Sequence, residues 1–208
     1  MTTWSAGVAP GSGGCGELGA EQDRDEAEQG QRQGGWSGDR KGGGGRRRGG
    51  EVVRVQDRFD STIDDLWSAL TDPGRLGRWL GEFDGDLRLG GTFKARFFAS
   101  EWQGTGRIDV CDPPHHLAVT TSDADQAEEH VIEAWLTPDG EGTVVIIEER
   151  GMPISLLPAY GAGVQIHLED LGTHLAGHER GDAQTRWKHL HPAYQALPST
   201  APEPGRGR

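Results

Sequence analysis

The segment HLEDLGTHLAGH, His167–His178, carries three histidines and two carboxylates within about three helical turns. At about 100° per residue, His167, Asp170, His174 and His178 fall on a single stripe of a helix. An i, i+4 pair of histidines can share one metal ion, but residues along a straight helix diverge, so a third ligand must come from another element. We therefore expect no metal and no other cofactor, and His174 and His178 are the candidate ligands if a metal binds.

Proton transfer is the other chemistry that the sequence offers. Glu149, Tyr160 and His167 are the candidates, provided that they face one cavity. A carboxyl group in an apolar cavity must be paired, protonated or in contact with a ligand, because burying it unpaired is costly. The alternative is that Glu149 pairs with Arg150 or turns to water at a strand edge. No serine or cysteine occupies a nucleophile elbow such as GxSxG, so the sequence does not support covalent catalysis.

The composition changes sharply along the chain. Residues 1–50 contain glycine runs such as KGGGGRRRGG and almost no periodic apolar residues, a composition that cannot bury a core. We expect disorder in residues 1–50 and 198–208, and one domain over residues 51–197. An alternative is that residues 1–50 are translated sequence from upstream of the true start codon. Detection of peptides from this segment in the native protein would exclude that alternative.

The charge restricts the partners. The formal net charge is −12, and residues 1–50 hold about as many acids as bases, so the predicted domain carries nearly all of it. Such a surface repels phosphate backbones and anionic lipid, so we expect neither nucleic acid nor a membrane as a partner. The basic run Arg46–Arg48 is better explained as a solvated linker. A secretory signal and an apolar run of about 20 residues are both absent from the sequence, which predicts a cytoplasmic location.

The elements that would position these side chains follow from hydrophobic periodicity. The pattern predicts a strand over 51–59, helices beginning at Ser61 or Thr62 and at Asp72–Pro73, and then strands at intervals of about ten residues. Residues 86–89 and 92–98 are expected to form a hairpin around Gly90–Gly91. The inward-facing residues of the next strand are expected to be Trp102, Gly104, Gly106, Ile108 and Val110. The two glycines among them predict bending of the strand or the close approach of another backbone.

The last long helix is expected to begin near Ala159 and to end at Gly177. The histidine stripe flanks its apolar side, so we expect the histidines at the rim of the core. A shorter helix follows through Trp187 and Leu190 and ends before His191–Pro192.

One set of mostly apolar side chains faces the space between the strands and the long helix, by strand parity and helical position. Most of these residues would be core wherever a sheet packs on a helix, with or without a ligand. The predicted cavity residues are Trp79, Phe93, Phe97, Trp102, Ile108, Leu117, Ile132, Leu136, Val145, Ile147, Glu149, Tyr160 and Val164.

Several phrases resemble a known superfamily when they are taken in order. They are RFDSTIDDLWSALTDPGRLGRWL, GDLRLGGTF, WQGTGRIDVCDPPHHLAVT, LTPDGEGTVVIIEERGMP and YGAGVQIHLEDLGTHLAG. Over about residues 51–178 the chain resembles the START-like, polyketide-cyclase-like (SRPBCC) superfamily, in its branch of activator of Hsp90 ATPase homologues (AHSA1-like). The resemblance implies an α+β helix-grip fold, in which a curved antiparallel sheet of about six to seven strands wraps a long C-terminal helix and leaves a cavity.

The resemblance implies several functions, because members of this superfamily carry hydrophobic ligands, catalyse cyclisation or dehydration, or assist chaperones. We expect first a protein, not an enzyme, that binds a small hydrophobic or aromatic ligand in the cavity. The alternatives are a cyclase- or dehydratase-type enzyme on the same fold and a chaperone-interaction module with a protein partner.

Overall fold

The computed structural model describes residues 52–123 and 128–197. The segments predicted to be disordered, 1–50 and 198–208, lie outside the described residues. The strands are β1 (Val52–Phe59), β2 (Gly81–Gly85), β3 (Thr92–Phe97), β4 (Gln103–Asp112), β5 (His116–Asp123), β6 (Glu129–Asp139) and β7 (Gly142–Arg150). The helices are α1 (Ile63–Thr71), α2 (Pro73–Trp79), α3 (Leu157–Leu175) and α4 (Ala183–Gln195), and a 3-10 turn, η1 (Ile154–Leu156), precedes α3.

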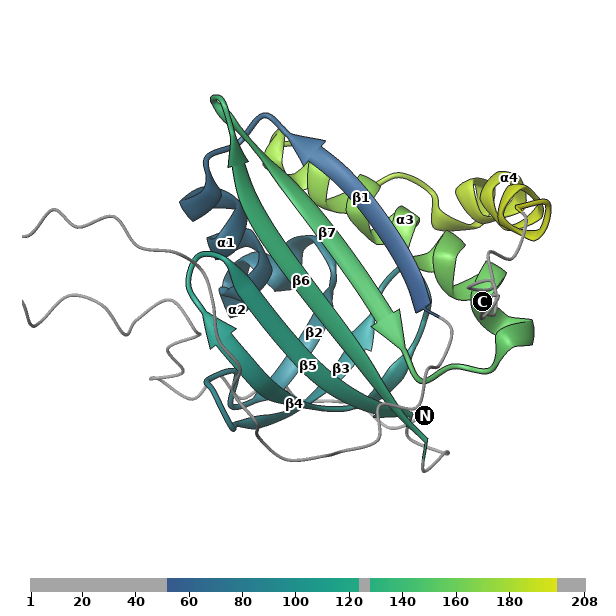
Figure 1. Ribbon diagram of the computed structural model, residues 1–208, viewed down its shortest axis with the longest axis horizontal. Coiled ribbons are helices and arrows are strands. Elements are labelled where there is room, and N and C mark those ends of the chain that lie inside the picture. Colours follow the sequence, from purple (N-terminus) through teal and green to yellow (C-terminus); the bar gives the residue numbers. More distant parts are fainter. Residues whose placement is uncertain (1–51, 124–127, 198–208) are drawn as a thin grey trace, which may run out of the picture.

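The seven strands form one antiparallel sheet in the order β1-β7-β6-β5-β4-β3-β2. Figure 1 shows this sheet curving around α3, with α1 and α2 at one end and α4 beyond α3. The first strand, β1, pairs with the last, β7, from Val52 opposite Arg150 to Phe59 opposite Thr143. This arrangement is the helix-grip fold expected from the resemblance, and it places one face of the sheet against α3.

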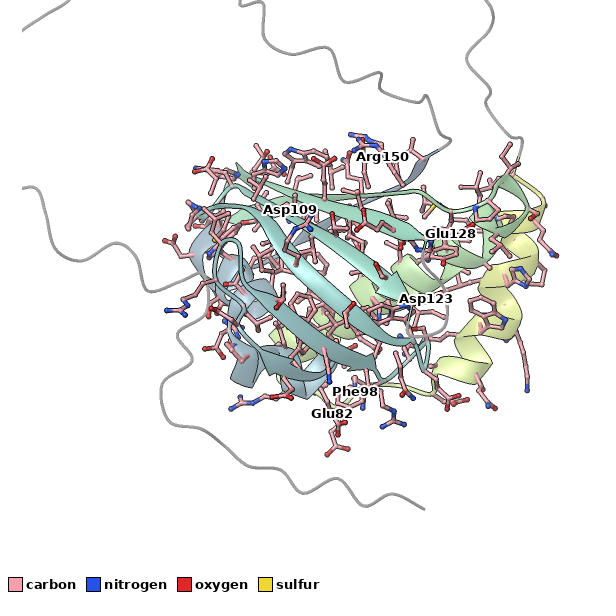
Figure 2. The ribbon with its side chains drawn as sticks, turned by 90° about the horizontal axis from the view of Figure 1, so that it is seen from below. Glu82, Phe98, Asp109, Asp123, Glu128 and Arg150 are labelled. Atoms are coloured by element: carbon pink, nitrogen blue, oxygen red, sulfur yellow. The ribbon has the colours of Figure 1, made fainter. Side chains whose placement is uncertain are left out.

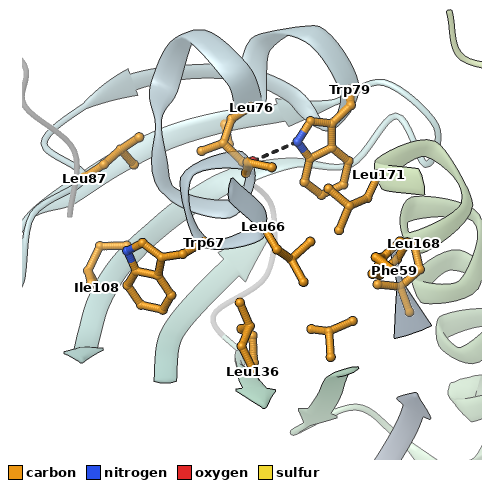
Figure 3. Close-up of a cluster of buried hydrophobic side chains, with 14 of the residues drawn as sticks. Phe59, Leu66, Trp67, Leu76, Trp79, Leu87, Ile108, Leu136, Leu168 and Leu171 are labelled. Carbon is orange, nitrogen blue, oxygen red and sulfur yellow. Dashed lines mark hydrogen bonds between the residues drawn. The ribbon is translucent and has the colours of Figure 1, made fainter. Parts of the chain in front are cut away.

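The two short helices begin as predicted and cover one end of the core. Thr62 Oγ1 accepts a hydrogen bond from the backbone N–H of Asp65 at 3.3 Å, and Asp72 Oδ1 accepts one from Arg75 at 2.8 Å. These caps satisfy N–H groups that the helices leave unpaired. The buried side chains beneath the helices come from β1, α1, α2, α3 and β6 (Figure 3): Phe59, Leu66, Trp67, Leu76, Trp79, Leu136, Leu168 and Leu171.

The prediction for the second strand was wrong. The strand is Gly81–Gly85, and residues 86–91 form the loop to β3, whereas the sequence pattern placed the strand at 86–89. Asp86 Oδ1 accepts hydrogen bonds from the backbone N–H of Arg88 at 3.0 Å and from its Nε at 2.8 Å, which closes a turn. The real strand has a single large apolar residue, Phe83, so its periodicity is too weak to recognise.

Strand β4 contains the glycines that predicted a close approach. A side chain at Gly106 would overlap the ring of Phe93, and one at Gly104 would overlap the ring of Trp102. Small residues here therefore let aromatic rings lie flat against the sheet. A bulge between Ile108 and Val110 shifts the register, so Cys111 packs against the core in place of the predicted Val110.

The last two helices differ from the predictions at their ends. Helix α3 begins at Leu157, and α4 continues through Pro192 to Gln195 instead of ending before it. Tertiary contacts hold this last turn, because the ring of Tyr194 packs on Gly161 and its hydroxyl donates to Gln165 Oε1 at 2.9 Å. Among the described residues, no helix is long and apolar enough to cross a membrane.

Candidate functional site

A cavity of about 1130 Å³ lies between the sheet and α3. Its lining extends to the loop after β3 and to the first turns of α4. The predicted cavity residues that line it are Trp79, Phe93, Phe97, Trp102, Ile108, Leu117, Ile132, Ile147, Glu149, Tyr160 and Val164. The other two predicted residues, Leu136 and Val145, do not line it, because they are 2% and 0% exposed in the closed part of the core. The volume is sufficient for a drug-sized organic molecule.

Aromatic side chains form one wall of this cavity. The ring of Phe83 lies 5.6 Å from that of Phe93 and 6.0 Å from that of Phe97, between centroids. Phe97 in turn lies 4.8 Å from Trp102 and makes an edge contact with His167 at 5.4 Å. These tilted and edge-on geometries are the favourable ones for aromatic pairs, so the wall is both apolar and well packed.

A polar group of side chains lies at the end of the cavity where β6 begins and β7 ends. The hydroxyl oxygen of Tyr160, in the first turns of α3, lies 3.2 Å from His130 Nδ1. His130 and Glu149 are both 7% exposed, and they come from neighbouring strands that pair Ile132 with Glu149. Glu149 lines the cavity, and none of the described residues forms a hydrogen bond or an ion pair with its carboxyl group.

Burial changes the ionisation of this group. Loss of hydration raises the pKa of Glu149 from 4.5 to about 8, and the charge of Asp123 adds to the effect. Burial also raises the pKa of Tyr160 to about 12, with further contributions from Glu149, Asp123 and Glu128. Figure 2 shows Asp123 and Glu128 at the same end of the sheet. At neutral pH, Glu149 is therefore mostly a protonated acid that can donate a hydrogen bond.

His167 lies inside the grip and not at its rim, contrary to the prediction. It lines the cavity, and within the described structure its buried Nδ1 has no hydrogen-bond partner. Burial lowers the pKa of His167 to about 4, helped by the positive charges of Arg186 and Arg180. The imidazole is therefore neutral at pH 7.

The rest of the histidine stripe separates in the structure. His174 lies at the rim, where its Nε2 accepts a hydrogen bond from Arg75 Nε at 3.4 Å, and His178 is exposed beyond the end of α3. In the part of the chain that the structure describes, no three His, Cys, Asp or Glu side chains come together in a metal-binding arrangement.

Asp170 is not at the rim either. It is fully buried, and its Oδ1 accepts a hydrogen bond from Arg186 Nη2 of α4 at 2.7 Å. The helical wheel could not predict this, because α4 covers the side of α3 that the wheel left open to water. Asp170 therefore joins two helices and does not belong to the cavity.

Sequence reasoning also missed part of the cavity wall. His130 alternates with Ile132 and Ala134 along β6, so strand parity could have found it. The loop after β3 and the first turns of α4 gave no such signal, because their place depends on how α4 packs. The missed lining residues from these two segments are Phe98, Ala99, Ser100, Glu101, Asp182, Ala183, Gln184, Trp187 and Lys188.

Comparison with known proteins gives the family. The model of the family described as activator of Hsp90 ATPase homolog 1-like protein matches residues 60–176, more than half of the chain. The crystal structure of CalU16 from Micromonospora echinospora is 29% identical, with a TM-score of 0.61, and the match covers 70% of this chain and 87% of that one. No curated protein matches the chain.

Two more distant structures share the fold. DynU16, from the dynemicin biosynthetic locus, is 24% identical over 63% of this chain and 50% of that one, with a TM-score of 0.58. An Hsp90 activator from Plasmodium falciparum is 17% identical over 61% and 97%, with a TM-score of 0.50. With the sequence phrases, the sheet order and the family match in agreement, this chain belongs to the activator of Hsp90 ATPase homolog 1-like family, within the START-like (SRPBCC) superfamily.

Proposed function

We propose that this protein binds a small hydrophobic or aromatic ligand in the cavity between the sheet and α3. The observation that carries the proposal is the cavity itself, about 1130 Å³ in volume with a wall of aromatic rings. A sheet that only needed a core against α3 would be filled by its own side chains, since protein interiors leave few large voids. An apolar cavity with a few polar groups is the usual form of a small-molecule site.

Two ionisable side chains that face the cavity are mostly uncharged at neutral pH, which favours a ligand whose buried part is neutral. Glu149, with a pKa of about 8, and His167, with a pKa of about 4, are both mostly neutral at pH 7. Each can still exchange hydrogen bonds with a hydroxyl or carbonyl group. The buried part of the ligand is therefore expected to be neutral, with polar groups of this kind.

Gly163 gives a direct test, because it lines the cavity from the middle of α3 and an added Cβ would meet nothing within 4 Å. We expect Gly163→Phe to fill part of the cavity and to weaken binding of N-phenyl-1-naphthylamine, an uncharged fluorescent probe, by about tenfold or more. The free energy of unfolding should stay the same or rise, since glycine weakens a helix by about 0.5–1 kcal/mol.

Gly77→Phe is the matched control. Gly77 is an exposed helical glycine with equally open space around its Cβ, and it lies outside the cavity. Unchanged probe affinity in Gly163→Phe, or an equal loss in Gly77→Phe, would refute the proposal. If the proposal holds, native mass spectrometry of the protein purified gently from its host, followed by denaturation, would identify the natural ligand.

The polar end of the cavity favours a second candidate, a cyclase- or dehydratase-type enzyme on the same fold. Glu149 is a protonated acid that faces the cavity, and the His130–Tyr160 pair lies at the same end. Such an acid can donate a proton to a carbonyl oxygen or a departing hydroxyl group. With the ligand identified, Glu149→Gln should reduce turnover by about a hundredfold and leave the fold intact. A folded variant with unchanged turnover would remove Glu149 from the mechanism.

A protein partner is the remaining alternative from the sequence. The family name points to chaperones, but the Hsp90 activator with a similar structure is only 17% identical, so it supports the fold alone. The test is a pull-down with the host chaperone together with a measurement of the chaperone's ATPase rate. An unchanged ATPase rate would eliminate this function. The cytoplasmic location stays a prediction.

A further inference from the structure

A second, smaller cavity of about 560 Å³ lies at the C-terminal end of α3. Four basic or titratable side chains from α2, α3 and the following loop face it: Arg78, His174, His178 and Arg180. Among the described residues, Glu179 is its only acidic lining residue. Convergence of these groups is unexpected in a chain whose formal net charge is −12.

The two arginines of this cavity are not neutralised by neighbours. In the described part of the chain, neither Arg78 nor Arg180 forms an ion pair, whereas nearby Arg75 pairs with Asp65 at 2.7 Å. Burial first, and then the charges of Arg75 and Arg78, lower the pKa of His174, which fits a region of positive potential. Two guanidinium groups are thus left to interact with an anion.

The small cavity adjoins the large one. Arg180 and Gly181 line both of them. The guanidinium carbon of Arg180 lies 4.2 Å from the centroid of the Phe98 ring, which itself lines the large cavity. A single molecule that occupied the aromatic cavity could therefore extend past Arg180 into the basic one.

We propose that the ligand is amphipathic, with an apolar body in the large cavity and a carboxylate or phosphate group in the small cavity against Arg78 and Arg180. This proposal rests on the ligand binding proposed above. Guanidinium groups recognise such anions through paired, charge-assisted hydrogen bonds. The neutral interior around Glu149 and the basic end at Arg78 would then select opposite ends of one molecule.

Two fluorescent probes test this, because they differ by one charged group. 1-Anilinonaphthalene-8-sulfonate carries an anionic sulfonate on the scaffold of the uncharged N-phenyl-1-naphthylamine. We expect the sulfonate to bind about tenfold more tightly to the full chain, and its advantage to shrink as salt rises. Arg78→Gln and Arg180→Gln should each reduce the ratio of the two affinities several-fold, and Arg78→Lys should restore part of it.

Arg96→Gln is the matched control, since Arg96 is exposed on β3 and lies outside both cavities. Equal affinity for the two probes, or the same ratio of their affinities in all variants, would contradict the proposed anionic group. Ligand binding in the large cavity would still be supported. If neither probe binds, or if Gly163→Phe weakens neither, the proposed function fails as well. Displacement of the sulfonate probe by dodecanoate or dodecyl phosphate identifies the preferred anion, and equal displacement by dodecanol would contradict the proposal.

Discussion

Two single side chains, Glu149 and His167, are held neutral in the cavity by the same cause. Each loses hydration, so the pKa of the acid rises and that of the base falls. Neither has a charged partner within hydrogen-bond distance among the described residues. Uncompensated polar side chains of this kind reduce stability, and they persist where a site uses them.

Glu149 gives a pH dependence of known sign. Its folded pKa of about 8 lies above the ordinary 4.5, so between these values the folded chain holds a proton that the unfolded chain has lost. The contribution to the free energy of unfolding is therefore fully present below about pH 4.5 and is lost as pH rises through about 8, on the order of 5 kcal/mol in total. Glu149→Gln should remove this loss, as measured by urea unfolding at pH 5 and pH 8.

Glu82→Gln is the control for this comparison, because Glu82 is an exposed glutamate on β2. Equal pH slopes in the wild-type protein and in Glu149→Gln would mean that Glu149 ionises normally in the cavity.

The sequence predicted some of these side chains better than others, for physical reasons. Glu149 was placed toward the cavity by strand parity, which a two-residue repeat determines without knowledge of the partner strand. His167 was predicted at the rim because a helical wheel describes one helix alone. Its burial depends on neighbours from other elements, such as Phe97 of β3 and Arg186 of α4. His130 was missed although the same parity applied to it.

The contact between α3 and α4 holds together the elements around the site. Helix α3 is covered by the sheet on one side and by α4 on another, and Arg186 joins the two helices through Asp170. The same guanidinium also donates to the carbonyl oxygens of Ile166 and Gly181, each at 3.3 Å. Because α4 forms part of the cavity wall, this contact also maintains the shape of the cavity.

Arg186→Ala should destabilise the protein by about 3 kcal/mol, because it leaves the Asp170 carboxylate buried without its partner. Urea unfolding would measure the loss, and hydrogen exchange should increase over residues 183–195. The double variant Asp170→Asn, Arg186→Met should recover much of the stability, since it removes the buried charge. If Arg186→Ala loses less than about 1 kcal/mol, α4 is held by its other contacts.

Errors at the level of the elements have a common origin. The cap residues Thr62 and Asp72 were predictable because capping is local. The end of α4 was not, since Pro192 is a strong local stop signal that is overridden by the packing of Tyr194 on Gly161. Strand β2 was misplaced because it is defined by pairing with β3 and has little pattern of its own.

At the scale of the whole molecule, residues 52–123 and 128–197, which the structure describes, build the core and both cavities. Every strand of the sheet has its partner there, as does every helix. We propose that a shortened chain of residues 51–197 folds by itself and keeps its melting temperature within about 3 °C of the full chain. Thermal unfolding monitored by circular dichroism would check this, and a fall of about 10 °C would assign a stabilising role to the flanking segments.

The pairing of β1 with β7 has a consequence for synthesis. Strands β2 to β6 each meet a partner that is adjacent in the chain, but β1 leaves the ribosome first and pairs only with Gly142–Arg150. Until then its backbone groups have no partner in the sheet, and the core under α1 and α2 lacks one wall. The sheet therefore cannot be completed before β7 has been synthesised, and until then β1 is a strand of the nascent chain without its sheet partner.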